Sequence, residues 1–237
     1  RYLIYGYKFL HKTNETFFER LYRLESATNM IISNNSQKKI NFWTPEIKQN
    51  KNMSYEDVVE KSRHYLLNSI KLRLRSDVPL AFCLSGGIDS ASLASIAKKC
   101  FNYDVVTFSI IDKDERYNEL DNISATLKDL NCDHFFVELN YQDIFSKLEN
   151  LIEYHDAPIS TISYLIHSFL SEQIKANGFK VSISGTSADE IFTGYYDHFN
   201  LHLYEMRNHE SFNSHLKNWE NYILPNIRNP YLKNPKL

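Results

Sequence analysis

The hexapeptide SGGIDS, residues 85–90, contains the residue types that bind a large anion. Its adjacent glycines lack a Cβ atom, so the backbone can adopt positive φ angles and approach a ligand closely. The hydroxyl groups of Ser85 and Ser90 add hydrogen-bond donors at its rim. Asp89 alone would repel a phosphate group, but Mg²⁺ binds phosphates together with one or two carboxylates. The hexapeptide therefore predicts a site for phosphate and magnesium.

The flanking residues predict the elements that would position this site. Residues 78–84 (VPLAFCL) are mostly apolar, which is typical of a short strand buried on both faces. After the hexapeptide, Leu93, Ala94, Ile96 and Ala97 recur at helical spacing. A helix that starts at the turn directs its unpaired N–H groups and the positive end of its dipole at the anion. The alternative is an ordinary strand-to-helix turn that happens to contain two glycines.

Two other phosphate loops do not match the hexapeptide. The Walker pattern requires a lysine directly after its second glycine, and the first lysine here is Lys98. The dinucleotide fingerprint requires a third glycine where Ser90 stands. SGGIDS instead resembles the PP-loop of the ATP pyrophosphatase superfamily, whose members cleave ATP between the α and β phosphates.

Composition and charge narrow the function classes. The 237 residues are 43% hydrophobic and 24% charged, with a net charge of −2, as in an ordinary globular protein. This balance gives no electrostatic reason to expect a nucleic-acid or membrane partner. The three cysteines, Cys83, Cys100 and Cys132, are odd in number and widely spaced, and we expect Cys83 and Cys100 to face the core. We therefore predict free thiols and a cytoplasmic protein.

The order of elements predicts an α/β fold with a parallel, doubly wound sheet flanked by helices. Strands are expected at 78–84, 104–111, 134–139 and 179–184, and helices at 54–74, 119–130, 141–154 and 161–177. Strands that alternate with helices of this length form parallel sheets covered on both faces. In such sheets ligands bind beyond the carboxyl ends of the strands, at a switch point in strand order.

The first residues differ from the rest. Residues 1–45 are interpreted as the end of a β-rich domain that begins before Arg1, with strands at Ile4–Leu10 and Asn29–Ile32. Polar residues 46–53 are expected to form a linker. Residues 54–237 would form the ATP-dependent domain, which starts with a helix capped by Ser54 and favoured by Asp57 in its first turn.

A second motif, SGTSADEIFTGYYDHF at 184–199, follows the fourth expected strand. Asp189 is the candidate for a second carboxylate on the metal that Asp89 holds. Glu190 is explained by the favourable dipole of a first helical turn. Two acidic groups on a magnesium–pyrophosphate unit would stabilise the charge of the departing pyrophosphate.

The two motifs together resemble the synthetase domain of glutamine-dependent asparagine synthetases, a family that includes β-lactam synthetase-like relatives. YGY, FFERLYRL and FW near the start of the chain resemble the end of that family's glutaminase domain. The resemblance implies that a carboxylate, usually aspartate, is activated by ATP and Mg²⁺ as an acyl-adenylate. Ammonia from glutamine then displaces AMP.

The resemblance also assigns residues to roles. The residues implied to hold the ATP phosphates and Mg²⁺ are Ser85, Gly86, Gly87, Asp89 and Ser90. Those implied to line the adenine and ribose are Cys83, Leu84, Ile110, Ser184 and Gly185. Asp189 is implied to bind the metal, so that Asp89 and Asp189 are both catalytic candidates.

Two positions depart from the family's pattern. Thr186, the third catalytic candidate, stands where the family has an acidic residue, and Ser187 stands where glycine is usual. A carboxylate there could deprotonate ammonia better than a hydroxyl group can. The family's glutaminase cysteine and its later catalytic lysine do not match any residue here, and Lys233 and Lys236 follow the second motif too closely. We therefore expect this chain to be a fragment.

Three hypotheses follow. The first is an AMP-forming carbon–nitrogen ligase of the asparagine synthase type, which uses aspartate and glutamine-derived ammonia. The second changes the acceptor to a carboxylated sugar or another metabolite used for surface polysaccharide. The third is a nucleotide-binding scaffold without catalysis. All three leave the oligomeric state open, with a homodimer as one option.

Histidines give weaker signals. His198 and His202 are spaced like metal ligands on a helix, but without a third ligand they are better explained by packing or surface roles. His155, Asp156 and Pro158 would lie in the acceptor pocket by resemblance, or else form a plain turn.

Overall fold

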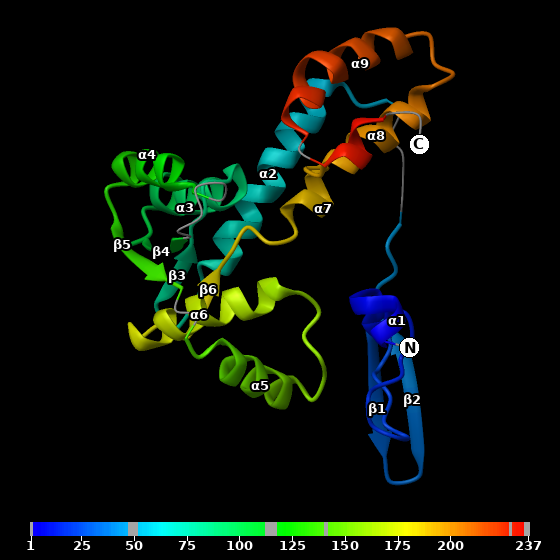
Figure 1. Ribbon diagram of the computed structural model, residues 1–237, viewed down its shortest axis with the longest axis vertical. Helices are drawn as coiled ribbons and strands as arrows, with labels where there is room; N and C mark the ends of the chain where they lie inside the picture. Colours follow the sequence, from blue (N-terminus) through cyan, green and yellow to red (C-terminus); the bar gives the residue numbers. More distant parts are fainter. Residues whose placement is uncertain (1, 47–51, 112–117, 140–141, 228, 235–237) are drawn as a thin grey trace.

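A computed structural model describes residues 2–46, 52–111, 118–139, 142–227 and 229–234 (Figure 1). Its centre is a four-stranded sheet in the order β5–β4–β3–β6, in which every pairing is parallel. The strands are β3 (Leu80–Cys83), β4 (Val106–Ile111), β5 (Asp133–Glu138) and β6 (Val181–Ile183). Each lies at an expected position, so the predicted parallel α/β fold is confirmed.

Helices cover both faces of the sheet (Figure 1). One face packs against α3 (Ile88–Phe101) and α4 (Leu120–Leu130), and the other against α5 (Ile144–His155) and α6 (Ile162–Ala176). Side chains in β3 alternate between the two cores, as strand geometry requires. Leu80 and Phe82 join the α3 side, and Ala81 joins the α6 side. The strand is therefore buried on both faces, and the doubly wound arrangement is confirmed.

The sheet has a switch point between β3 and β6. From β3 the chain adds β4 and then β5 on one side, and it then returns to place β6 on the other side of β3. Ala81 lies beside Ser182 and Phe82 beside Ile183 in this parallel pair. The loops that follow β3 and β6 therefore leave the same edge of the sheet as neighbours, where ligands bind in such folds.

Helix α2 (Tyr55–Arg73) leads into the sheet and packs against α3. Its start is a capping box. The Ser54 hydroxyl accepts from the Asp57 N–H at 3.1 Å, and the Asp57 carboxylate accepts from the Ser54 N–H at 3.2 Å. The predicted cap is confirmed, and Asp57 acts through a direct hydrogen bond. Most of the predicted linker, 47–51, lies outside the described residues.

The start of the chain forms helical turns and a hairpin, drawn apart from the sheet in Figure 1. It contains α1 (Tyr2–Tyr5), the 3₁₀ turn η1 (Gly6–His11) and an antiparallel hairpin of β1 (Thr28–Ser33) with β2 (Ser36–Asn41). The expected strand Asn29–Ile32 is confirmed. The expected strand Ile4–Leu10 is wrong, because Gly6 takes a left-handed φ of 62° that interrupts an extended run. Strand β2 was missed because SQKKIN lacks apolar alternation.

The last residues form short helices around a small core of their own. They are α7 (Ala188–Phe192), α8 (Tyr196–Met206), α9 (Phe212–Asn218), the π turn η3 (Trp219–Ile223) and the 3₁₀ turns η4 (Leu224–Asn226) and η5 (Pro230–Lys233). Leu203, Trp219 and Ile227 are buried together there. Within the described ranges, no helix combines the length and apolar content that a membrane crossing requires.

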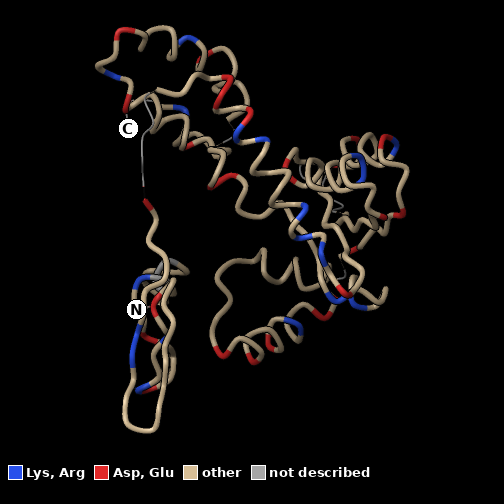
Figure 2. Tube along the Cα trace, turned by 180° about the vertical axis from the view of Figure 1, so that it is seen from behind, with Lys and Arg blue, Asp and Glu red and all other residues tan. Residues whose placement is uncertain are grey.

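Charges and thiols complete the overall description. Acidic and basic residues are interspersed along the trace (Figure 2). Cys83, Cys100 and Cys132 are all described, and none forms a disulfide, as predicted. Cys83 and Cys132 are half-buried, but Cys100 is exposed, so the expectation that it faces the core is wrong. It is the penultimate residue of α3, and the residues of this helix that are buried are Ser90, Ala94 and Ala97.

Candidate functional site

A cavity of about 370 Å³ lies at the switch point, between the loops that follow β3 and β6 and the side of α6. The candidate residues that line it are Cys83, Leu84, Ser85, Gly87, Asp89, Ser90, Ile110, Ser184, Gly185 and Thr186. Gly86 and Asp189 are not among its lining residues. The cavity therefore brings both sequence motifs together, as the strand order requires.

The first loop is held in shape by its own serines. The Ser90 hydroxyl accepts from the Ser85 N–H at 3.0 Å and lies 3.2 Å from the carbonyl oxygens of Ser85 and Gly87. The two hydroxyl oxygens are 2.9 Å apart. Ser90 is buried, so its hydroxyl is part of the loop's internal bonding and not a donor at the rim. A buried hydroxyl with several partners fixes a single loop conformation.

The strands anchor the base of this loop. The Leu84 N–H donates to the Phe108 carbonyl at 2.8 Å, and the buried Ser109 hydroxyl donates to the Leu84 carbonyl at 2.6 Å. Both groups come from β4, the neighbouring strand. Nothing in the local sequence indicated that Ser109 would support the loop.

Glycine is required at position 86 for a reason that differs from the one expected. Neither Gly86 nor Gly87 has a positive φ. A Cβ on Gly86 would lie 2.7 Å from the Glu119 Cβ and 3.2 Å from the Asn122 Cβ. Glycine is therefore needed at position 86 because the start of α4 lies close to the loop, and a larger residue would block this contact.

Helix α3 begins directly after the first loop, where the sequence predicts a helix. Its N-cap is Gly87, which has no side chain to cap the first N–H groups, and Asp89 lies in its first turn. These N–H groups carry the positive end of the helix dipole. Asp89 is half-buried and lines the cavity beside them.

The second loop packs directly on the first. A Cβ on Gly185 would lie 2.9 Å from both the Asp89 Cβ and the Ser90 backbone nitrogen. The Ser184 and Thr186 hydroxyl oxygens are 3.0 Å apart at the cavity wall. Glycine in the second motif therefore permits the contact by which the two motifs form one site.

Asp189 points elsewhere in this structure. It lies in the first turn of α7, where it was predicted, and its backbone carbonyl accepts from the Gly194 N–H at 3.1 Å. A Cβ on Gly194 would fall 1.6 Å from the Asp189 Oδ1, so this carboxylate occupies the space that the glycine leaves open. Next to it, Tyr195 donates to the Glu190 carboxylate at 2.9 Å, and this bond raises the Tyr195 pKa.

The cavity lining also includes residues that the sequence did not single out. They are Phe108, Glu119, His167, Leu170, Ser171, Ile174 and Ser182. Most come from α6, whose helical pattern showed a buried face without showing which residues border the cavity. Burial raises the pKa of the Cys83 thiol, and a hydrogen bond with Ser182 opposes this shift in part.

The charges of the lining fit a magnesium-bound nucleotide. Asp89 and Glu119 are its acidic members, and the described residues that line it include no Lys or Arg. A polyphosphate would therefore need a cation to offset the carboxylates. The described residues contain no group of three or more His, Cys, Asp or Glu side chains that could hold a metal, so a cation here would need ligands from the nucleotide and water. Mg²⁺ suits this donor set because it commonly uses one or two carboxylates, phosphate oxygens and water.

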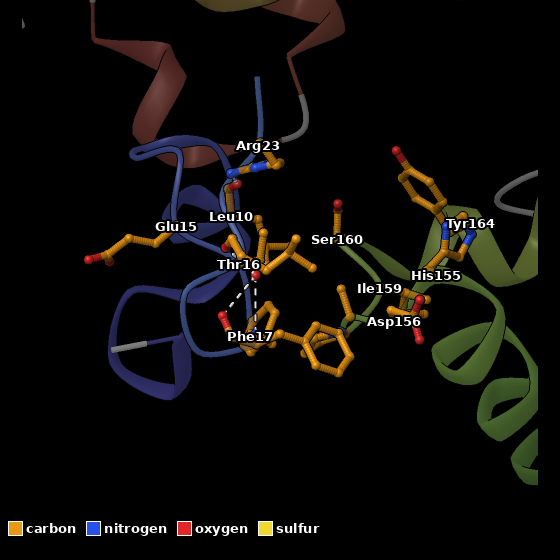
Figure 3. Close-up of a pocket in the computed structure, with 14 residues that line it drawn as sticks. Leu10, Glu15, Thr16, Phe17, Arg23, His155, Asp156, Ile159, Ser160 and Tyr164 are labelled. Carbon is orange, nitrogen blue, oxygen red and sulfur yellow. Dashed lines mark hydrogen bonds between the residues drawn. The ribbon is translucent and has the colours of Figure 1, made fainter. Parts of the chain in front are cut away.

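A second cavity of about 330 Å³ lies between the N-terminal segment and the α5–α6 turn. Figure 3 shows His155, Asp156 and Tyr164 on one side of it and Phe17 and Arg23 on the other. His155, Asp156 and Pro158, which were considered for an acceptor pocket, line this cavity and not the one at the switch point.

Comparison with known proteins identifies the family. Residues 61–233 match the family described as Asparagine synthase, and this match includes both loops of the cavity. The chain belongs to the asparagine synthase family. Residues 61–233 thus form an asparagine synthase-like domain, of the class that carries out ATP-dependent amidation.

The chain is also similar to curated proteins. The amidase chyE of Penicillium rubens is 28% identical over 206 residues, which cover 77% of this chain and 30% of that protein. Asparagine synthetase [glutamine-hydrolyzing] 1 of Bacillus subtilis is 29% identical over 140 residues, which cover 59% of this chain and 22% of that protein. The chain thus spans less than a third of the length of either relative.

Among solved structures, the NH3-dependent NAD synthetase of Campylobacter jejuni is similar, with 18% identity and a TM-score of 0.36. The matched region covers 76% of this chain and 90% of that one.

The second loop also contains a strained residue. Ser187, which stands where the family has glycine, has a φ of 76°. This left-handed conformation is easy for glycine and costs other residues about 1 kcal/mol or more.

Proposed function

We propose that this chain contains the ATP-binding part of an AMP-forming amide ligase. In the first step an acceptor carboxylate attacks the α-phosphorus of ATP, the α–β phosphoanhydride bond breaks, and an acyl-adenylate and pyrophosphate form. In the second step ammonia attacks the acyl carbon, and AMP leaves as the amide forms. The observation that carries the proposal is the contact of Gly185 with Asp89, through which two distant motifs line one cavity at the switch point.

The proposed roles follow from position. The first N–H groups of α3 bind the phosphates. The hydrogen bonds between Ser85 and Ser90 fix the loop, so these N–H groups are in position before ATP binds. Cys83, Leu84 and Ile110 give the apolar wall for the adenosine. Bound Mg²⁺ would offset the charge of the departing pyrophosphate. Asp89 is its first protein ligand.

Asp189 is proposed as the second metal ligand. This role requires its carboxylate to turn from Gly194 towards Asp89 when magnesium and nucleotide bind. The motion involves a half-buried side chain on a five-residue helix, α7.

Aspartate, amidated with ammonia from glutamine, is the proposed acceptor, and the reaction is placed in the cytoplasm, where the thiols stay reduced. A different carboxylate, such as a carboxylated sugar, is a second candidate. It is favoured by Thr186 at the cavity wall, where the family has an acidic residue, and by relatives that are named amidases.

The decisive experiment supplies the full-length protein with Mg-ATP, glutamine and either aspartate or a panel of other carboxylates, uronic acids included. Release of AMP and pyrophosphate that depends on one acceptor supports the ligase and identifies the substrate. Release of ADP and phosphate would refute the assignment of the first loop. Tight binding of ATP with no cleavage on any acceptor would instead favour a nucleotide-binding scaffold.

A further inference from the structure

The start of α4 holds both sides of Gly86, at the outer bend of the nucleotide loop. The Glu119 carboxylate accepts from the Gly86 N–H at 2.9 Å. The Asn122 side-chain amide donates to the Gly86 carbonyl at 3.3 Å. Such a pair of bonds from one helical turn restrains the orientation of the loop backbone, as a single bond would not.

Gly86 does not itself line the cavity, whereas its neighbours Ser85 and Gly87 do. The bond from Glu119 therefore leaves the cavity-facing part of the loop available to phosphate. Glu119 could either keep its bond to Gly86 when nucleotide binds or compete with phosphate for the Gly86 N–H group. The placement of Gly86 outside the cavity favours the first.

Glu119 has a second effect, because it also lines the cavity. Its negative charge adds to that of Asp89 in a lining whose described residues include no Lys or Arg. Two carboxylates facing one cavity oppose the entry of a polyphosphate that carries no metal ion. A nucleotide that already carries Mg²⁺ escapes most of this repulsion.

We propose that Glu119 is a positioning residue: as a hydrogen-bond acceptor it fixes the nucleotide loop, and as a charge it makes the cavity select metal-bound over metal-free ATP. This inference rests on the proposed function, because it takes the cavity to be the ATP site. It assigns the two effects to two separable properties of one side chain.

Substitutions at position 119 separate the two properties. Glu119→Gln keeps an oxygen that can accept from Gly86 but removes the charge, and Glu119→Ala removes both. Asp121→Asn is the matched control, since it removes one exposed negative charge from the same helical turn. Affinities for ATP with excess Mg²⁺ and for ATP in EDTA are measured by calorimetry on the full-length protein. Hydrogen exchange of the amides at 85–88 is measured without nucleotide.

We expect Glu119→Gln to keep its Mg-ATP affinity within about threefold while the preference for Mg-ATP over free ATP falls about tenfold. Glu119→Ala should lose about tenfold in Mg-ATP affinity and should also show faster exchange at 85–88. Asp121→Asn should change neither quantity. Equal melting temperatures for the variants would show that the changes are local.

Two results would overturn the inference. One is an unchanged Mg-ATP to free-ATP ratio in Glu119→Gln, and the other is unchanged exchange at 85–88 in Glu119→Ala. Failure of the proposed function looks different, because the unsubstituted protein itself would then not bind ATP or would not release pyrophosphate.

Discussion

The loop after β3 and the loop after β6 line the same cavity but reach it by different physical means. The first is tied by Ser85, Ser90 and the start of α4, and none of residues 84–90 has a left-handed backbone. The second contains Ser187, a non-glycine residue with a φ of 76°, and Thr193 at the far end of the following α7 also has a positive φ, of 62°. Such positions cost of order 1 kcal/mol each and persist only where surrounding contacts impose them. The first loop is thus held by hydrogen bonds, and the second segment holds backbone strain.

The largest effect should come from the carboxylate on the preformed side. Asp89→Asn keeps the shape of the residue but removes the charge that we propose holds the metal. Loss of such an electrostatic contact typically lowers turnover about 10²–10³-fold. We expect a loss of this size in pyrophosphate release, and a smaller one, about tenfold, for Asp189→Asn. If Asp189→Asn were the more damaging variant, the second loop and not the first would be the main holder of metal.

A slightly smaller effect is expected where the two loops touch. Gly185→Ala places a methyl group 2.9 Å from the Asp89 Cβ and from a backbone nitrogen, which cannot move aside. Overpacking of this kind costs about 1–3 kcal/mol of folding free energy. It would also displace one loop against the other, and because a misplacement of about 1 Å can lower a rate about 10²-fold, we expect pyrophosphate release to fall by up to about 10²-fold.

The matched comparison for Gly185→Ala is Gly87→Ala. Its methyl group meets the Ser85 hydroxyl at 3.3 Å, which can rotate, so it should lose less activity. Melting temperatures of the two variants complete the test. Equal losses would mean that contact between the loops is not what the glycine at 185 provides.

The reactivity of the Cys83 thiol tests the burial of the cavity wall, because Cys83 is the last residue of β3 and lines the cavity. Burial raises the pKa of Cys83, so at pH 8 a smaller fraction of this thiol is thiolate than for an ordinary cysteine. Because the thiolate is the reactive form, its alkylation rate should increase only at a higher pH. Cys100 is exposed and serves as the internal control. We expect Cys83 to react about tenfold more slowly with iodoacetamide at pH 8, and more slowly still with Mg-ATP present. Mass spectrometry of both peptides measures this; equal rates would contradict the burial of Cys83.

The smallest effect concerns the strain in the second loop. Ser187→Gly removes the penalty of a left-handed residue, while Ser187→Ala keeps it. The free energy of unfolding should therefore be about 1 kcal/mol higher for the glycine variant than for the alanine variant. Chemical denaturation measures this difference. A difference near zero would show that the turn relaxes and stores no strain.

The sequence was sufficient for the features that depend on local pattern. Apolar residues around each motif predicted the strands, and strand order then brought Asp89 and Gly185 together. The role of Gly86 was misjudged because a glycine permits both positive φ and close approach, and the sequence does not say which one is used. Glu119 was missed because its contact joins residues 33 apart in the chain. No local signal tells which helix end will lie on a loop.

The same limit explains the errors elsewhere. The side-chain direction of Asp189 depends on the space above Gly194, which only the folded turn reveals. Residues 4–10 have the apolar and aromatic content of a strand, yet in the described structure they form helical turns instead of pairing with a neighbour. A strand is a property of two chain segments, so one segment alone is weak support for it.

The position of β6 in the chain has a consequence for synthesis on the ribosome. Strand β3 emerges early, but its neighbour β6 follows only after residues 84–180 have been made. At 5–20 residues per second, the first loop waits on the order of 5 to 20 s for its partner. During that interval the nascent chain exposes one edge of the short strand β3, and the two loops do not yet form one cavity. ATP bound as proposed would therefore stabilise the finished domain and would not guide its earliest folding.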